Sequence, residues 1–535
     1  MNKNLFYLFL VVFFLAACQK REETTPIENP NTEVSNNTQD EGPMVLGKKL
    51  ENPYSVKNMR IAYKRLMGKK NYSVKTSATD ENAVTTTHYY VRFLPKDTAE
   101  YDRLKTDTTL HLYQIPLDYE IISSGSNYQD TTGKPTWQYT AVKKGYQFDP
   151  NIQYEILEEL YIPETVEATT TSALGSNKSN PNQFTIDLVN ESMKLTNNLK
   201  DTLKSTNDIK TLYRPSGRIR VFDTRLNAYI PLVGVQIRGR RWFNFQRTYT
   251  DANGNYSLGY FGGNTNLSIF YETNDFDVRS GTFGQAWLDG PHTNDPWSVD
   301  ISGGVQRFYA HVFRGARRYH HGDIGGLNRP DKPYNIKYAA YDKRGSSQGM
   351  NVMVHIVWPD ISIWRYKSNG EEYSSDEIFS TAVHETAHSS HLTRMNSGLI
   401  QYAQVSSKLI ESWAVGVEWM ITQKEYRERG ITNYSGPEYD RTGTISYPIS
   451  RAYQYWNRNF NDPNYTPLYI DLIDDYNQAS TGIGSITDNV RGYTLPQIEG
   501  FLKHIYGLSS LNEQLKAHKP VGVTDAQIDQ LLGQY

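Results

Sequence analysis

Cysteine is almost missing from this chain, because Cys18 is the only one among 535 residues. A single cysteine excludes any disulfide within one molecule, so the fold must be stabilised by its hydrophobic core. The chain also lacks an excess of either charge: its formal net charge is −2, with both signs interspersed along the sequence. We therefore expect no nucleic-acid partner. We find neither long repeats nor coiled-coil heptads.

Long hydrophobic runs are absent except near residue 1. The basic segment Asn2-Lys3-Asn4 precedes an apolar run over residues 5–15, which is too short for a conventional transmembrane helix. The run ends in Leu15-Ala16-Ala17-Cys18. A short basic segment followed by such a run predicts a signal peptide, which we place at residues 1–17.

The end of this run resembles the lipobox of bacterial lipoproteins. The resemblance implies cleavage before Cys18, a diacylglycerol on its sulfur and anchoring to a membrane by acyl chains. The alternative is an ordinary secretory signal with a chance cysteine, but the single use of cysteine in the chain argues against it. Gln19 is not the aspartate of the usual inner-membrane retention cue, and residues 20–23 resemble surface-export signals of Bacteroidetes lipoproteins. We predict an outer-membrane lipoprotein, compatible with exposure at the cell surface.

Composition divides the rest of the chain into regions. Residues 18–46 are polar and predict a disordered, lipid-anchored tether. We assign residues 47–210 to an N-terminal α+β domain rich in strands, with a short helix in 47–75 and a Ser/Thr/Asn-rich linker or long excursion over 166–210. Its strand-like runs are 89–94, 110–113 and 137–142, and the run 154–161 suits either a helix or a strand.

Residues 214–275 carry three runs typical of a small β-sandwich. These are Gly217–Asp223, Pro231–Ile237 and Thr248–Leu258, with Asp251-Ala252-Asn253-Gly254 as a tight turn. The runs resemble the carboxypeptidase-regulatory-like family, which has a transthyretin-like β-sandwich and implies a structural spacer without catalysis. We interpret the Gly-, Asp- and Asn-rich residues 276–304 as a linker.

The pattern with the most chemical content is H-E-x-x-H at His384, Glu385 and His388. A capping-box pattern at Ser374 and Glu377 and an apolar stripe predict a helix over 375–396. Histidines four residues apart on a helix share one face and can hold one Zn²⁺, whose bound water a neighbouring carboxylate can deprotonate. We expect this face to border a cleft. The alternative is a surface helix with two unrelated histidines.

A catalytic zinc usually has three protein ligands, so a third is needed. The metzincin extension is excluded, because His391 and Arg394 occupy the positions where it needs glycine and a ligand. A second apolar helix, from Ser407 to near Gly430, carries Glu411 and Glu418 on one face. Glu411 is the preferred third ligand and Glu418 the runner-up. The alternative to metal binding is that the side chains of both glutamates face solvent or pair with arginines such as Arg427.

Residues 374–420 resemble the active-site core of glutamate-zincin metallopeptidases. The resemblance implies that His384, His388 and Glu411 bind zinc and that Glu385 is the general base. The chain departs from the thermolysin-like pattern at Val415, where a carboxylate that orients a histidine is expected. His391 is interpreted mainly as a helix-face residue with a backbone or carboxylate partner, and alternatively as a contact for substrate or an oxyanion.

We assign residues 305–535 to a mainly helical, zincin-like domain. It is expected to begin with a helix over 305–317 and strands at 336–341 and 350–358, the latter beside the cleft. Helices are expected near 447–460, 495–507 and 524–534. A transition-state donor is also expected from the C-terminal half. The sequence does not choose among its candidates, which are Tyr447, Tyr453, Tyr455 and His504.

The sequence thus predicts a multidomain α+β protein with an N-terminal β-rich domain, a small β-sandwich and a C-terminal zincin-like domain. The predicted function is zinc-dependent hydrolysis of a protein or peptide substrate by a cell-envelope lipoprotein. The alternative is a surface binding or adhesion lipoprotein with a structural or inactive zinc site. Glu385 argues against this alternative, because a purely structural site needs no base between its ligands.

Overall fold

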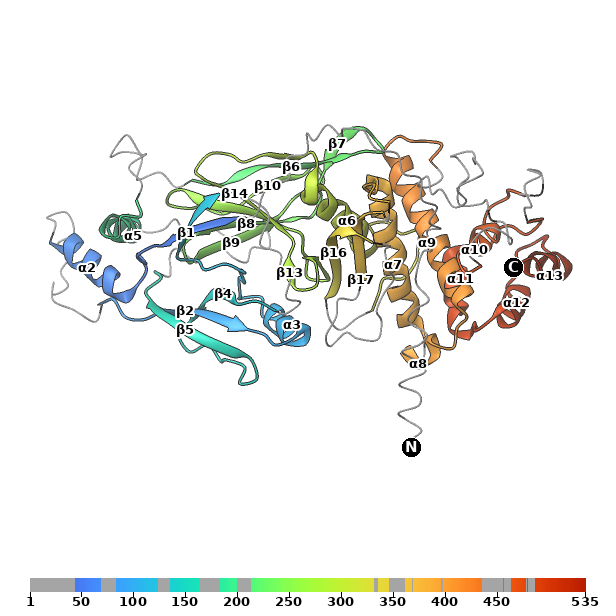
Figure 1. The fold of residues 1–535 in the computed structure, drawn as a ribbon, viewed down its shortest axis with the longest axis horizontal. Coiled ribbons are helices and arrows are strands. Elements are labelled where there is room, and N and C mark those ends of the chain that lie inside the picture. The colour runs from blue at the N-terminus through green and yellow to red at the C-terminus, as the bar shows by residue number, and fades with distance from the viewer. Residues whose placement is uncertain are drawn as a thin grey trace.

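The computed structural model describes residues 44–68, 83–123, 135–163, 183–199, 213–331, 335–345, 361–367, 369–395, 398–434, 456, 463–477, 479 and 486–535. Cys18 and the predicted tether lie outside these residues. The molecule is elongated, with strands in its centre and helices α7 to α13 at one end (Figure 1). The fold is mixed α/β, with several sheets and a helical C-terminal region. None of the described helices is long and apolar enough to cross a membrane.

The N-terminal region contains two small antiparallel sheets. One has the strand order β4-β2-β5 and the other pairs β1 with β3. Helices α2, α3 and α5 accompany them, and α2 begins after Ser55, whose side chain accepts a hydrogen bond from the Asn58 amide. The bounds are β1 (Val45–Lys49), α2 (Val56–Met67), β2 (His88–Leu94), α3 (Thr98–Thr106), β3 (Tyr119–Ser123), β4 (Gln138–Lys143), β5 (Gln153–Leu160) and α5 (Gln183–Leu195).

The structure resolves one ambiguous prediction for this region and corrects two others. The ambiguous run 154–161 is a strand, because it pairs with β2 along its length. The predicted strand at 110–113 is wrong: only Tyr113 makes a bridge, to Tyr139, and the other residues supply buried side chains to a core. The linker predicted over 166–210 is wrong for residues 183–195, because α5 packs its apolar residues beside α2.

The central region contains two four-stranded sheets whose facing side chains share one core. One sheet holds β6 (Ser216–Asp223), β7 (Ala228–Pro231), β10 (Asn255–Ser257) and β15 (Val299–Ile301). The other holds β8 (Gln236–Arg241), β9 (Asn244–Tyr249), β11 (Thr265–Phe270) and β14 (Trp287–Thr293). The predicted tight turn is present: Gly254 has φ +78° and donates to the Asp251 carbonyl at 3.0 Å. A Cβ at Gly254 would lie 2.3 Å from the Ile219 carbonyl oxygen, so only glycine fits there.

The linker predicted over 276–304 is wrong, because this segment contains β12 (Phe276–Ser280), β13 (Gly284–Gln285), β14 and β15. Strands β14 and β15 complete the two central sheets, while β12 pairs in parallel with β16 (Ile336–Arg344). Strand β16 in turn pairs in parallel with β17 (Ile361–Tyr366). The turn residues that suggested a linker lie between short strands, each of which pairs with at least one other strand. Sequence composition does not distinguish such strands from a linker.

The C-terminal region is built on three long helices that pack side by side: α6 (Gly304–His321), α7 (Ser375–Arg394) and α9 (Ser407–Glu428). Helix α6 approaches α7 closely at Gly315, where a Cβ would lie 2.5 Å from the Phe379 carbonyl oxygen. Shorter helices follow: α8 (Leu399–Tyr402), α10 (Leu468–Asp471), α11 (Leu495–Phe501), α12 (Leu508–Ala517) and α13 (Asp525–Leu532). The predicted strand at 350–358 and most of the predicted helix at 447–460 lie outside the described residues.

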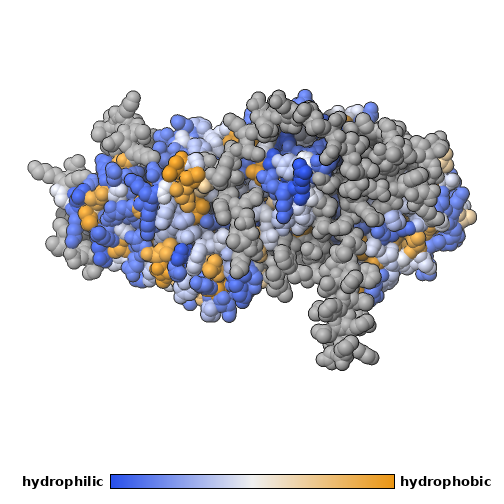
Figure 2. Space-filling view, viewed as in Figure 1, coloured by the Kyte–Doolittle hydropathy of each residue, from blue (hydrophilic) through white to orange (hydrophobic). Residues whose placement is uncertain are grey.

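The surface is mostly hydrophilic on the face that Figure 2 shows, with separate small apolar groups over the strand-rich half. The exposed large apolar side chains are accordingly scattered, among them Ile122, Ile156 and Ile400. The largest hydrophobic core instead lies among the C-terminal helices, where α7 and α9 pack against the segments that follow them. This core fixes the two helices that carry the candidate site.

Candidate metal centre

Helix α7 is fixed at its start and along its length. The predicted capping box is present: Ser374 accepts from the Glu377 amide, and the Ser374 amide donates to Glu377 Oε2 at 2.7 Å. Further along, the hydroxyls of Thr386 and Tyr338 are hydrogen-bonded at 2.6 Å, which joins α7 to strand β16. The helix therefore presents its histidines from a rigid, buried backbone.

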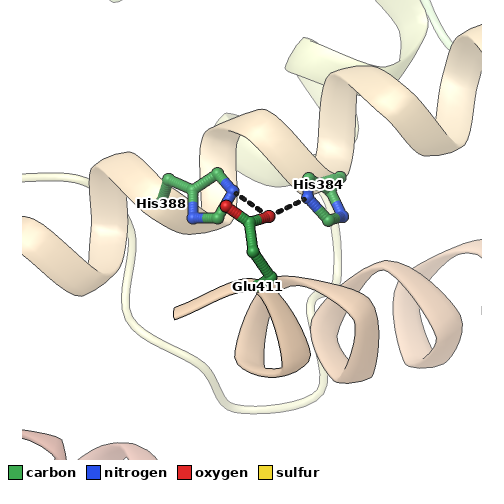
Figure 3. Close-up of side chains that lie close together, drawn as sticks. All are labelled: His384, His388 and Glu411. Atoms are coloured by element: carbon green, nitrogen blue, oxygen red, sulfur yellow. Dashed lines mark hydrogen bonds and ion pairs between the residues drawn. The ribbon is translucent and has the colours of Figure 1, made fainter. Parts of the chain in front are cut away.

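The structure brings together the three side chains that the sequence selected as metal ligands. His384 and His388 project from α7, and Glu411 projects from α9 toward both imidazoles (Figure 3). Glu411 Oε2 lies 3.4 Å from His384 Nε2 and 3.4 Å from His388 Nε2. All three side chains are buried. The alternatives of a chance pair of histidines and of a solvent-facing or arginine-paired Glu411 do not describe this geometry.

These spacings fit a single ion better than they fit hydrogen bonds. A hydrogen bond from an imidazole N–H to a carboxylate is about 2.7–2.9 Å long. Ligand atoms held about 2.0–2.2 Å from one zinc ion at tetrahedral angles instead lie about 3.3–3.5 Å apart. Although Glu411 is near, His388 Nε2 is a buried nitrogen without a hydrogen-bond partner among the described residues. The residues present therefore fit a zinc ion.

Each histidine is oriented by a second residue bonded to its other ring nitrogen. His384 Nδ1 donates to Glu418 Oε2 at 2.9 Å, and His388 Nδ1 lies 3.3 Å from the Tyr402 hydroxyl. The Glu418 carboxylate can only accept, so it fixes the His384 tautomer that leaves Nε2 free for a metal, whereas the Tyr402 hydroxyl orients the His388 ring. Glu418 lies at the outer nitrogen of His384 rather than between the two imidazoles, so it has the position of the orienting carboxylate that Val415 cannot supply. It comes seven residues after Glu411, two turns along the same face of α9.

The charges around the two helices favour a cation. Although burial opposes it, the Glu411 and Glu418 carboxylates raise the pKa of His384 to about 9. Despite its own burial, Glu411 has a pKa well below its usual range because His388 and His384 lie against it. In the absence of an ion, protonated His384 therefore supplies the positive charge beside these carboxylates. A divalent cation would displace that proton, since metal binding to histidine needs the neutral ring.

Glu385 lies in the turn between the two histidines and is 4% exposed. Its carboxylate is close enough to His384 to raise the pKa of that imidazole. Its neighbours in the chain, His384 and Thr386, are held by Glu418 and Tyr338, so its backbone position is fixed. The residue is therefore placed beside the candidate metal position without being part of the ligand group.

His391 differs from the other two histidines of α7. We expected a backbone or carboxylate partner, but both of its ring nitrogens are buried without a hydrogen bond among the described residues. It packs edge-on against Tyr402 at 5.1 Å between ring centroids and contacts Trp413 at 6.3 Å. Burial, with the neighbouring His388, lowers the pKa of His391 to about 3. The described residues therefore supply no polar partner for His391, which packs as a neutral ring among aromatic side chains, and its alternative role as a substrate contact stays a prediction.

The candidate transition-state donors are not brought to the site by the described part of the chain. Tyr447, Tyr453 and Tyr455 lie outside the described residues, and His504 is exposed. A different tyrosine is present instead: the Tyr465 ring stacks on the His384 ring, with centroids 6.0 Å apart and planes 22° apart. Nothing in the sequence marks this residue among 40 tyrosines, and Tyr402 was missed for the same reason.

A buried ionic network fixes α6 and α9 to the central sheets. Arg314 of α6 donates to Asp223 Oδ2 at 2.9 Å and to Glu425 Oε1 at 3.0 Å. Tyr426 of α9 donates to the same Asp223 oxygen at 2.9 Å. His311 completes the group, with Nε2 3.0 Å from the Phe222 carbonyl oxygen. This network holds the helix carrying Glu411 in register with the end of strand β6.

The cleft that we expected beside the histidines is not open at these residues. His384 is 4% exposed and His388 is 2% exposed, and the Tyr465 ring covers one of them. Access for a substrate therefore needs movement of a covering segment. The predicted groove strand at 350–358 lies outside the described residues, so its place beside the site stays a prediction.

Comparison with known proteins adds little to this geometry. No family model matches the chain, and no curated protein matches it. Among solved structures, the crystal structure of a 9R-lipoxygenase from Cyanothece PCC8801 aligns at 12% sequence identity with a TM-score of 0.12. The alignment covers 47% of this chain and 33% of that one, so the chain spans about a third of that structure. A likeness this weak carries no argument, and the functional case depends on the site itself.

Proposed function

We propose that the chain is a zinc-dependent hydrolase of peptide bonds. The observation that carries the proposal is the position of Glu411 Oε2, 3.4 Å from each of two imidazole nitrogens. Glu385 stands in the same helical turn as these ligands. A carboxylate between two metal-binding histidines is the arrangement of water-activating peptidases. A purely structural site has no use for it.

Each residue of the site has one task in this proposal. His384, His388 and Glu411 hold the ion, while Glu418 keeps His384 in the required tautomer and Tyr402 orients the His388 ring. Zinc held there supplies a Lewis acid for the scissile carbonyl and lowers the pKa of water. Glu385 takes the proton from the attacking water and then delivers it to the leaving amine.

The setting of this activity is also part of the proposal. The lipobox-like segment ending at Cys18 supports a lipoprotein of the outer membrane, with the folded part held away from the membrane by residues 18–46. We infer three domains: an N-terminal β-rich domain, a transthyretin-like sandwich over 214–275 and a zincin-like domain over 305–535. Strands β14 and β15 join the sheets of the second domain although they follow residue 275.

One observation favours a second function. The ligands and Glu385 are all at most 4% exposed, which is typical of a structural metal site closed to solvent. A surface binding or adhesion lipoprotein with a structural or inactive zinc site therefore remains the competing proposal. The two proposals differ in whether a substrate reaches Glu385.

Glu385→Gln separates the two proposals. We expect the full chain with this change to keep its zinc, because no ligand is altered, and to lose about 10²- to 10⁴-fold in kcat on casein or a peptide library. Zinc is measured by elemental analysis. Glu428→Gln, an exposed glutamate of α9, is the matched control and should retain full activity. Equal turnover by wild type and Glu385→Gln, or zinc-loaded wild type without cleavage, favours the structural site.

A further inference from the structure

Three aspartates converge at the end of the molecule opposite the N-terminal region. Asp471 ends α10, Asp474 lies in the turn that follows, and Asp488 lies in the extended segment before α11. One carboxylate oxygen of each lies within 4.8 Å of the other two. Asp471 and Asp488 are buried and Asp474 is half-buried. Three carboxylates this close repel one another, and burial makes their charge costly without a cation.

One oxygen in this cluster has no partner. Asp488 Oδ1 accepts a hydrogen bond from the Val490 amide at 3.0 Å. Asp488 Oδ2 is buried without a hydrogen bond among the described residues, and the residue is 4% exposed. A buried carboxylate oxygen with free lone pairs beside two further carboxylates needs either a proton or a metal ion.

We propose that Asp471, Asp474 and Asp488 bind a hard divalent cation, calcium. Calcium takes about 6–8 oxygen ligands at about 2.3–2.6 Å, so two of its ligands lie at most about 5 Å apart. The three carboxylate oxygens lie within 4.8 Å of one another, so one such ion can reach all three. Magnesium usually keeps several waters and is bound by only one or two carboxylates, so three protein carboxylates favour calcium. The donors are all oxygen and include no imidazole, which sets this site apart from the zinc-type cluster.

The surroundings allow hydration and entry of the ion. A pocket of about 370 Å³ borders Asp488 and is lined by polar residues that include Asp475, Asn477 and Asn489. Calcium often completes its coordination with water and amide oxygens, and both are available to this pocket. The cluster is therefore accessible from outside even though Asp488 itself is buried.

The position of the cluster gives the ion a structural role. Asp471 accepts a hydrogen bond from the Tyr535 hydroxyl, and Asp488 belongs to a separate segment, so an ion would join three parts of the chain. The segment that leads into α10 carries Tyr465, which stacks on His384, and Thr466, which bonds Ser412 of α9 at 2.7 Å. Calcium would thus stabilise the segment that covers the histidine cluster.

The test uses the full chain with one equivalent of zinc, in buffer freed of other metals by a chelating resin. Calcium chloride, magnesium chloride and excess zinc chloride are added in separate thermal unfolding experiments. Terbium luminescence, excited through tyrosine, reports direct binding because Tyr535 contacts Asp471. The variants are Asp488→Asn and Asp474→Asn. Glu513→Gln removes the same charge from an exposed position on α12, outside the cluster and its pocket, and is the matched control.

We expect saturating calcium to raise the Tm of wild type and Glu513→Gln by roughly 5 °C, more than magnesium or zinc does. Calcium should also displace terbium from both proteins. Asp488→Asn and Asp474→Asn should lose the Tm shift and the terbium signal; if one of them does not fold, the other decides. The proposal is overturned by a wild type without a calcium shift, by equal shifts in wild type and Asp488→Asn, or by a larger shift with magnesium. These results are independent of peptidase activity.

Discussion

The two clusters of possible metal ligands in this molecule differ in what holds them. His384, His388 and Glu411 project from the middle of two long packed helices, α7 and α9. Asp471, Asp474 and Asp488 lie at the end of a four-residue helix and in extended segments. The first set mixes nitrogen and oxygen donors, whereas the second offers oxygen alone. The difference matches the metals: zinc requires few ligands at fixed angles, and calcium accepts many ligands in flexible geometry.

The comparison also shows how support around a site is distributed. Each imidazole of the helical cluster has an orienting partner, Glu418 or Tyr402. In the acidic cluster, Asp488 is oriented by a backbone amide. The helical cluster is therefore rigid before any ion binds, while the acidic cluster depends more on the ion itself. Three changes of decreasing effect test this contrast.

The largest effect is expected from removing the shared ligand. Glu411→Gln takes away the carboxylate that lies between both imidazoles, so zinc affinity should fall by more than about 100-fold. Retained zinc after dialysis, measured by elemental analysis, checks this. The calcium-dependent Tm shift should stay as in wild type, because no ligand of the acidic cluster changes. Loss of both metals together would show that the two clusters are not separate sites.

A smaller effect is expected from the orienting carboxylate. Glu418→Gln keeps the shape of the side chain but weakens its bond to His384 Nδ1, so zinc affinity should fall about 10- to 100-fold. The affinity is measured by competition with a chromogenic chelator. Glu428→Gln on the exposed side of α9 is the control and should bind zinc as wild type does. Unchanged affinity in Glu418→Gln would contradict the orienting role.

The smallest effect concerns the scaffold under the helical cluster. Burial, and then the Arg314 charge, lower the pKa of His311 to about 3, whereas an unfolded histidine has a pKa of about 6.5. Between these values the unfolded state binds the extra proton, so the stabilising contribution is complete above about pH 6.5 and is lost as pH falls toward 3. From pH 7 to 4.5 this removes roughly 2.5 kcal/mol from the free energy of unfolding.

Urea unfolding at the two pH values measures this loss. His311→Gln has no titrating ring but keeps an amide that can donate to the Phe222 carbonyl. Its free energy of unfolding should therefore fall less than that of wild type between the two pH values, and the difference should equal the loss assigned to His311. An identical acid loss in wild type and His311→Gln would show that His311 does not titrate on unfolding as proposed.

Much of the helical site could be predicted because its information is local. The spacing of His384 and His388, the capping box at Ser374 and the apolar stripe all act within a few turns of one helix, and the structure agrees with each. Glu411 could be selected because a carboxylate in an apolar helix is costly without a partner. Helices α6 and α9 and strand β16 likewise follow from local patterns, and each has close to the predicted bounds.

The strands of residues 276–301 could not be predicted, because short strands rich in turn residues are stabilised by partners distant in sequence. Strand β12 depends on β16, and β15 depends on β6. The same limit explains the interpretation of His391, whose isolation from polar partners depends on Tyr402 and Trp413 packing against it.

The sequence alone determined which residues share a helical face, because the α-helix has a fixed period of 3.6 residues. It thereby selected two imidazoles, a carboxylate beside them and a third candidate ligand. Only the tertiary structure decided that Glu418 contacts the outer nitrogen of His384, that Tyr402 and Tyr465 contact the histidines, and that three aspartates meet near Tyr535. These contacts join separate segments, and their formation is governed by packing of the whole core rather than by any local period.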